Sequence, residues 1–177
     1  MIPMILFRAF YDICLFQKRP QDLPAARELL WVILVLYAAV SAVLSYPSQT
    51  VTIALVTGLI EAMMLMLITW LFLYLRSVPE RWLQTCTALG GTGVIFSLVA
   101  SPLFYIQVFI EAGQALGALI GTLVVVLLLW NIAVMAHIFK HALSSSYVFG
   151  VLGTLTYIAL ITFTLQLVLA DPAGGGL

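Results

Sequence analysis

The stretch Thr50–Leu75, TVTIALVTGLIEAMMLMLITWLFLYL, decides the fold of this chain, because Glu61 is its only charged residue. About 20 consecutive apolar residues are enough for an α-helix to cross a bilayer. Strands of membrane barrels are about 10 residues long and alternate in polarity, which this stretch does not. In lipid, each backbone N–H and C=O group must be bonded within its own helix or a closed barrel. The stretch therefore predicts a membrane-spanning helix.

Four further stretches have the same character, and the whole chain is 64% hydrophobic and 8% charged. A soluble domain carries roughly 25% charged residues, so lipid is the expected solvent for most of this chain. We predict an all-α membrane protein whose transmembrane domain, residues 28–170, contains five transmembrane helices. The expected spans are residues 28–46, 50–75, 83–110, 114–139 and 147–169. Residues 171–177, DPAGGGL, are expected to form a disordered external tail.

Residues 1–27 are predicted to form a separate cytoplasmic segment. An amphipathic helix is expected over residues 4–17, which is too short to span and suits the headgroup plane. The alternative is a cytosolic helix packed on the spans. A polar linker follows over residues 18–27, KRPQDLPAAR, where two prolines favour an extended or turning backbone.

The basic residues fix a predicted orientation, because all seven fall before the first span or in the alternate gaps that follow. Lys and Arg concentrate on the cytoplasmic side of membrane proteins. The N-terminus is therefore expected in the cytoplasm and the C-terminus outside. Cys14 and Cys86 then both face a compartment that keeps thiols reduced, so no disulfide is expected. The basic residues are Arg8, Lys18, Arg19, Arg27, Arg76, Arg81 and Lys140.

Glu61 is the most unusual residue, because it lies roughly 16 Å into its span, near the midplane of the membrane. A charge there is costly, and no Lys or Arg is expected at that depth. A protonated carboxyl group that donates a hydrogen bond is the predicted state. Asn131 is the expected partner, with Gln107, Thr57 and backbone carbonyls as others. This candidate polar cluster is interpreted as a clip between helices, and the alternative is a proton or ion relay.

Glycine recurs every fourth residue at the start of the fourth predicted span, at Gly113, Gly117 and Gly121. Such a ridge lets a neighbouring helix approach closely. We expect these glycines to pack the five-helix bundle, with self-association through the ridge as the alternative.

No catalytic, cofactor or metal site is predicted, and the chain is not expected to be an enzyme. The sequence carries no nucleophile motif and no phosphate-binding glycine loop. His137 and His141, one turn apart, are interpreted as interfacial side chains, since a structural zinc site wants four ligands. The net charge is zero, which does not favour a nucleic-acid partner. Expected partners are membrane lipids and other membrane helices.

Two segments carry a family resemblance. Residues 81–103, RWLQTCTALGGTGVIFSLVASPL, look like the third span of Yip1-domain membrane proteins. Residues 127–157, LLLWNIAVMAHIFKHALSSSYVFGVLGTLTY, look like the fourth span, the basic turn and the start of the fifth. The long N-terminal region of eukaryotic members, with its DLYGP-like motif, is absent, so the chain is more similar to the short prokaryotic type. The resemblance implies five spans and a bacterial inner-membrane location, and it carries no functional residue over.

The sequence therefore predicts a polytopic inner-membrane scaffold or assembly protein of Yip1-like type without catalytic activity. The alternative is a small transporter or channel subunit organised around Glu61. The surroundings of Glu61 distinguish the two, because transport needs a continuous wet cavity and a clip needs a dry, hydrogen-bonded pocket.

Overall fold

A computed structural model of the chain describes residues 2–45, 50–109 and 114–169. Five of its helices are long and apolar enough to cross a membrane, which confirms the predicted all-helical, five-span class. They are α2 (Arg27–Ser45), α3 (Val51–Leu75), α4 (Trp82–Phe109), α5 (Gln114–Ala142) and α6 (Tyr147–Leu169). Three short elements accompany them: α1 (Ile2–Cys14), η1 (Pro20–Asp22) and η3 (Pro79–Arg81).

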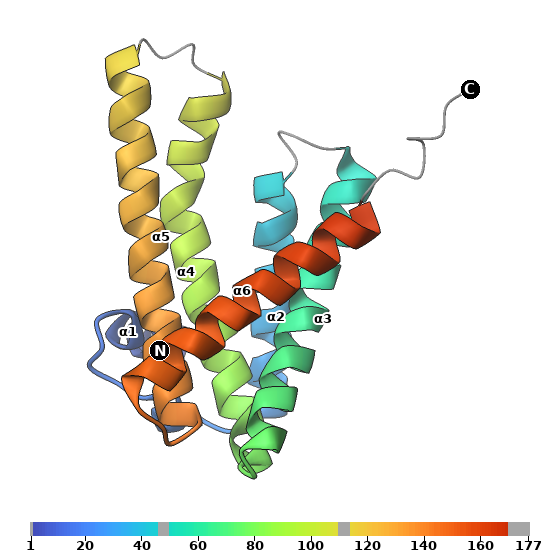
Figure 1. Ribbon diagram of the computed structural model, residues 1–177, viewed down its shortest axis with the longest axis vertical. Helices are drawn as coiled ribbons and strands as arrows, with labels where there is room; N and C mark the ends of the chain where they lie inside the picture. Colours follow the sequence, from blue (N-terminus) through green and yellow to red (C-terminus); the bar gives the residue numbers. More distant parts are fainter. Residues whose placement is uncertain (1, 46–49, 110–113, 170–177) are drawn as a thin grey trace.

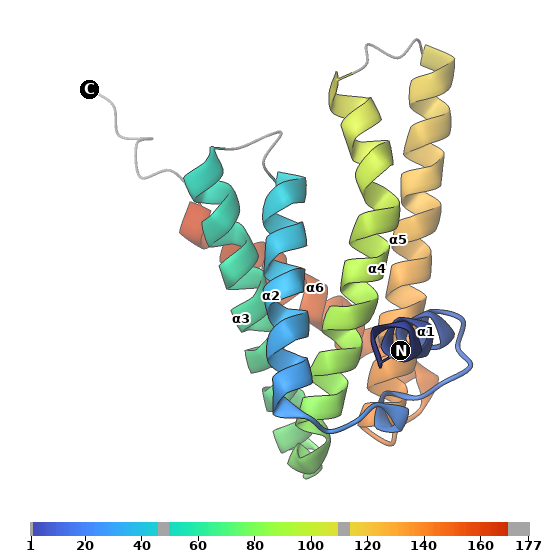
Figure 2. The same cartoon turned by 180° about the vertical axis from the view of Figure 1, so that it is seen from behind.

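The spans form two pairs and a crossing helix (Figures 1 and 2). Helices α2 and α3 make one pair, and α4 and α5 make the other. The two pairs are close at the end where η1 lies, and they diverge toward the opposite end. Helix α6 begins beside the C-terminal end of α5. It then runs obliquely across one face of the molecule to α3 in the other pair.

Small residues set the closest approaches between helices. A Cβ atom on Gly58 of α3 would lie 2.3 Å from the carbonyl oxygen of Ala38 in α2. A Cβ atom on Gly150 of α6 would lie 2.3 Å from the carbonyl oxygen of Ala136 in α5. Side chains at these two glycines would force the backbones apart, so both hairpins depend on a residue without a side chain.

Three helices end in the same hydrogen-bonded turn, although none of them has glycine there. Phe16 after α1, Ser77 after α3 and Ser144 after α5 adopt positive φ angles of 62°, 57° and 48°. In each turn the next residue bonds back five positions, as Ser145 N–H does to the Lys140 carbonyl at 3.0 Å. This pattern satisfies carbonyl groups at the helix end and turns the chain sharply.

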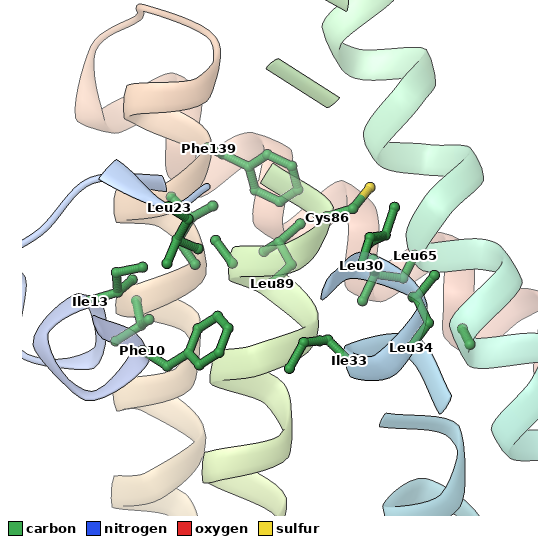
Figure 3. Packing of buried hydrophobic residues seen from close by; sticks show 14 of the residues in the cluster. Phe10, Ile13, Leu23, Leu30, Ile33, Leu34, Leu65, Cys86, Leu89 and Phe139 are labelled. Atoms are coloured by element: carbon green, nitrogen blue, oxygen red, sulfur yellow. The ribbon is translucent and has the colours of Figure 1, made fainter. Parts of the chain in front are cut away.

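The buried core is concentrated at the η1 end of the molecule. Figure 3 shows side chains from the linker, α1, α2 and α4 meeting there, together with Phe139 of α5. Ile13 of α1 is completely buried, and Leu23 of the linker is nearly so. The N-terminal segment is therefore part of the tertiary core and is not loosely attached to it.

Helix α1 lies across α4 and α5, and its packing depends on a glycine. A Cβ atom on Gly91 of α4 would lie within 2.4–2.7 Å of the Phe10 ring. The indole N–H of Trp130 donates a 3.0 Å hydrogen bond to the carbonyl of Cys14, the last residue of α1. The helix begins and ends slightly earlier than predicted. It packs on the spans, as the alternative expectation had it, and a position in the headgroup plane stays a prediction.

Candidate functional site

The carboxyl group of Glu61 pairs with a hydroxyl from the neighbouring helix. Ser41 of α2 and Glu61 Oε2 of α3 share a hydrogen bond. The approach of the two helices at Gly58, one turn earlier on α3, brings these side chains together. Ser41 was not among the partners predicted from the sequence. Serine is common in membrane helices, and its position relative to Glu61 depends on how α2 and α3 pair.

Two tyrosines complete a polar cluster around Glu61. Tyr37, one turn from Ser41 on α2, and Tyr157 of α6 both lie close enough to Glu61 to interact electrostatically with it. Tyr157 is 5% exposed. Among the described residues, no Lys or Arg forms an ion pair with Glu61. The cluster therefore joins α2, α3 and α6 through neutral hydrogen-bonding groups and one carboxyl group.

The predicted pairing of Glu61 with Asn131 is wrong. Asn131 of α5 lines a separate cavity between the two helix pairs, while Glu61 bonds Ser41. Thr57, another predicted partner, donates from its hydroxyl to the carbonyl of Ile53 at 2.9 Å. The side chain of Gln107 lies outside the described residues. The physical reason is that the two helix pairs diverge, so that α3 and the middle of α5 belong to different pairs and lie apart (Figure 1).

The glycine ridge of α5 does not pack inside the chain. A Cβ atom on Gly117 or Gly121 would meet no described residue within 4 Å. Gly113, the third predicted member, lies outside the described residues. The expected role of these glycines in building the bundle is therefore wrong at Gly117 and Gly121, and the packing role belongs to Gly58 and Gly150. Self-association through the ridge stays a prediction.

An apolar groove lies beside that ridge, between α4, α5 and α2. Its volume is about 300 Å³. Asn131 forms no hydrogen bond with any described residue, although it lies within the apolar part of α5. The lining includes Leu44, Phe96, Ser97, Val124, Leu128 and Asn131.

A second cavity, of about 340 Å³, is polar and lies at the end where η1 and the turn after α5 meet. The linker, η3 and α5 each contribute a basic residue to it: Arg19, Arg81 and Lys140. From the sequence, these three residues indicate only the orientation of the chain. They come from three separate segments, and nothing in their sequence spacing indicates that they share one cavity.

Hydrogen bonds between distant segments hold this polar end together. Gln84 of α4 donates to the carbonyls of Gln21 and Leu23 at 3.1 and 2.8 Å. Gln21 in turn donates to the carbonyl of His141 at 2.7 Å. The linker is therefore fixed against the ends of α4 and α5.

The two histidines contact one another, with ring centroids 4.5 Å apart. His137 Nε2 lies 3.1 Å from the carbonyl oxygen of Lys18, so it is occupied by the linker. In residues 2–45, 50–109 and 114–169, no group of three or more His, Cys, Asp or Glu side chains is placed to hold a metal ion.

No family model, no curated protein and no solved structure matches this chain.

Proposed function

We propose that this protein is a non-catalytic, Yip1-like membrane scaffold that assembles through the glycine-bearing face of α5, with a second copy of the chain as the occupant. The observation that carries the proposal is the combination of an open glycine ridge and an amide without a partner on that face. A cell-inner-membrane location with the N-terminus in the cytoplasm belongs to the same proposal, and the distribution of the basic residues supports the orientation.

Spacings of four and three residues put the relevant side chains on one face of α5. The face runs along Gly117, Gly121, Val124, Leu128 and Asn131. Of the most apolar stretch of α5, 11% is buried within the chain, compared with 33% for α3. The most apolar stretch of α5 is thus less buried than that of any other described span.

The chemistry of this face suits a second copy. Copies inserted in the same orientation and related by a two-fold axis along the membrane normal place the same residues of two helices opposite each other. A glycine ridge allows the backbones to approach, and an asparagine amide both donates and accepts, so Asn131 can pair with the Asn131 of another copy. In lipid the alternative for this amide is to stay unpaired, which is unfavourable.

The length of the spans supports placing α1 at the membrane boundary. Helices α4 and α5 have 28 and 29 residues. They are therefore about 42 Å long, whereas the hydrocarbon core is about 30 Å thick. An end of roughly 10 Å projects from the core, and α1 packs toward the basic end of these helices. Its exposed aromatic residues Phe7 and Tyr11, and Phe16 in the turn that follows it, suit the interface.

Crosslinking of single cysteines in native membranes tests the assembly. In a background with Cys14→Ala and Cys86→Ala, Gly121→Cys should form an oxidant-induced dimer. Val126→Cys is the matched control, because it is exposed on the opposite face of the same helix. Equal crosslinking at both positions indicates random collision and contradicts the proposal, as does the absence of a Gly121→Cys dimer.

The alternative function, a transporter or channel subunit organised around Glu61, has weaker support. The two cavities nearest the helix-pair junction and the polar end do not include Glu61 in their lining. Its carboxyl group is already bonded to Ser41 and flanked by two tyrosines. This arrangement favours a hydrogen-bonded clip that joins three helices.

A further inference from the structure

The polar cavity at the η1 end has an excess of positive charge. Arg19, Arg81 and Lys140 line it, and Asp22 is the one carboxylate among the described residues of its lining. Asp22 Oδ2 accepts a 2.8 Å hydrogen bond from the backbone N–H of Arg19, so this carboxylate caps η1. Among the described residues the one ion pair is Lys18–Asp12. Within the part of the chain that the structure describes, none of the three cations therefore has a carboxylate partner within 4.0 Å.

Arg81 is held in place before any ligand arrives. One terminal nitrogen of its guanidinium donates to the carbonyls of His141 and Ala142 at 3.3 and 3.1 Å, and to the hydroxyl of Ser144. The remaining N–H groups have no hydrogen-bond partner among the described residues. A guanidinium fixed along one edge keeps a planar set of donors on the other, which matches two oxygens of a phosphate group.

Two buried polar atoms in the same cavity lack hydrogen-bond partners. They are the hydroxyl of Ser145 and Oε1 of Gln21. Buried polar groups are nearly always hydrogen-bonded, so two such atoms without partners in one cavity indicate that a polar ligand binds there. A phosphate oxygen can accept from the Ser145 hydroxyl, and a water molecule or a phosphate O–H can donate to Gln21.

We propose that this cavity binds a phosphate group, held by Arg19, Arg81 and Lys140 and by the hydroxyl of Ser145. The site goes beyond the proposed assembly through α5 and uses none of its residues. The phosphate group can come from an anionic lipid headgroup, since basic pockets between membrane helices bind such headgroups. It can also come from inorganic phosphate or a soluble phosphate ester.

The experiment uses the full-length protein in two arms. In the first, the protein in neutral detergent is titrated with inorganic phosphate at constant ionic strength, and binding is measured by calorimetry. In the second, the protein is reconstituted into nanodiscs of phosphatidylcholine with and without phosphatidic acid, and retained lipid is measured by native mass spectrometry. Binding only in the second arm assigns the lipid headgroup, and binding in the first assigns a soluble source.

Matched variants distinguish a site from general electrostatics. Lys140→Gln and Arg19→Gln should each weaken binding about tenfold in whichever arm shows it. Lys18→Gln removes the same charge from the same linker, but Lys18 pairs with Asp12 outside the cavity lining, so binding should be unchanged. Ser145→Ala should weaken binding several-fold, whereas Ser146→Ala, at the exposed neighbouring position, should not.

Thermal unfolding without phosphate checks that each variant is folded. If Lys140→Gln does not fold, Arg19→Gln alone tests the contribution of a cation. Two results overturn the proposal. One is no binding of either phosphate source by the wild-type protein. The other is a loss of phosphate binding in Lys18→Gln as large as that in Lys140→Gln or Arg19→Gln. Binding would then depend only on the net charge of this end of the molecule.

Discussion

Gly58 of α3 lies against the backbone of Ala38 in α2, so closely that a Cβ atom there would be 2.3 Å from the Ala38 carbonyl oxygen. The neighbour is main chain, which cannot move aside as the tip of a flexible side chain can. This contact sets the separation of α2 and α3, and it lies one turn from the carboxyl group of Glu61. The close contact at Gly58 therefore determines both how α2 and α3 pack and where the polar cluster around Glu61 lies.

Gly58→Ala should destabilise the folded protein by about 1–3 kcal/mol, because the added methyl group overpacks a backbone contact. The measurement is the thermal unfolding midpoint in detergent. Gly117→Ala is the matched control, since its methyl group would lie more than 4 Å from every described residue outside its own helix turn. Equal midpoints for the two variants would show that α2 and α3 separate easily.

Gly117→Leu separates the fold from the proposed assembly. If Gly117 packed the bundle, as the sequence predicts, a leucine there would disrupt the fold. The structure predicts instead that the monomer stays folded and that the Gly121→Cys crosslink is lost, because the leucine occupies the face offered to a second copy. Unfolding of the monomer by Gly117→Leu would restore the original expectation.

Glu61→Gln should be nearly silent in stability, because the amide keeps the shape and accepts the hydrogen bond from Ser41. Glu61→Leu should cost about 1 kcal/mol or less, since the lost hydrogen bond is partly offset by removal of a group that is expensive to bury. Proteoliposomes with an internal pH dye test the alternative function. A proton flux that Glu61→Gln abolishes would favour transport over the scaffold.

Cys14 reports on the docking of α1. Burial raises the pKa of the Cys14 thiol to about 11. The reactive species is the thiolate, which at pH 8 is then about a thousandth of the total. In a Cys86→Ala background, maleimide labelling should be slow and should speed up about tenfold per pH unit.

The matched variants for this test lie on α1 itself. Phe10→Ala removes the ring that packs on Gly91 and should accelerate labelling of Cys14 severalfold. Phe7→Ala removes a ring that is 59% exposed and should leave the rate unchanged. Fast labelling of the wild-type protein would show that α1 is not held against α4 and α5.

The orientation is tested by side-selective labelling of single cysteines. Positions near Val78 and Ser145 should be accessible from the cytoplasm, and positions near Ser48 and Ala112 from the opposite side. The reason is the concentration of all seven Lys and Arg residues in one set of segments. External labelling at Ser145 would contradict the predicted five-span topology.

The sequence by itself determined the number and the limits of the spans. A long apolar stretch in lipid forms an α-helix, because every backbone polar group must be paired and helical hydrogen bonds pair groups within the same stretch. The predicted limits of the second span, 50–75, agree with α3 to within a residue. The sequence also singled out Glu61 correctly as a polar residue within a span, because a charge in such a stretch stands out without knowledge of any neighbour.

Only the tertiary structure decided which residues meet. Ser41 rather than Asn131 bonds Glu61, and Gly58 and Gly150 rather than the α5 ridge make the close backbone contacts. A glycine shows where a helix surface lacks a side chain and could be approached closely. Whether another helix lies there depends on how the two helix pairs diverge. Arg19, Arg81 and Lys140 meet for the same reason: the linker is carried to the ends of α4 and α5 by hydrogen bonds between residues far apart in the sequence.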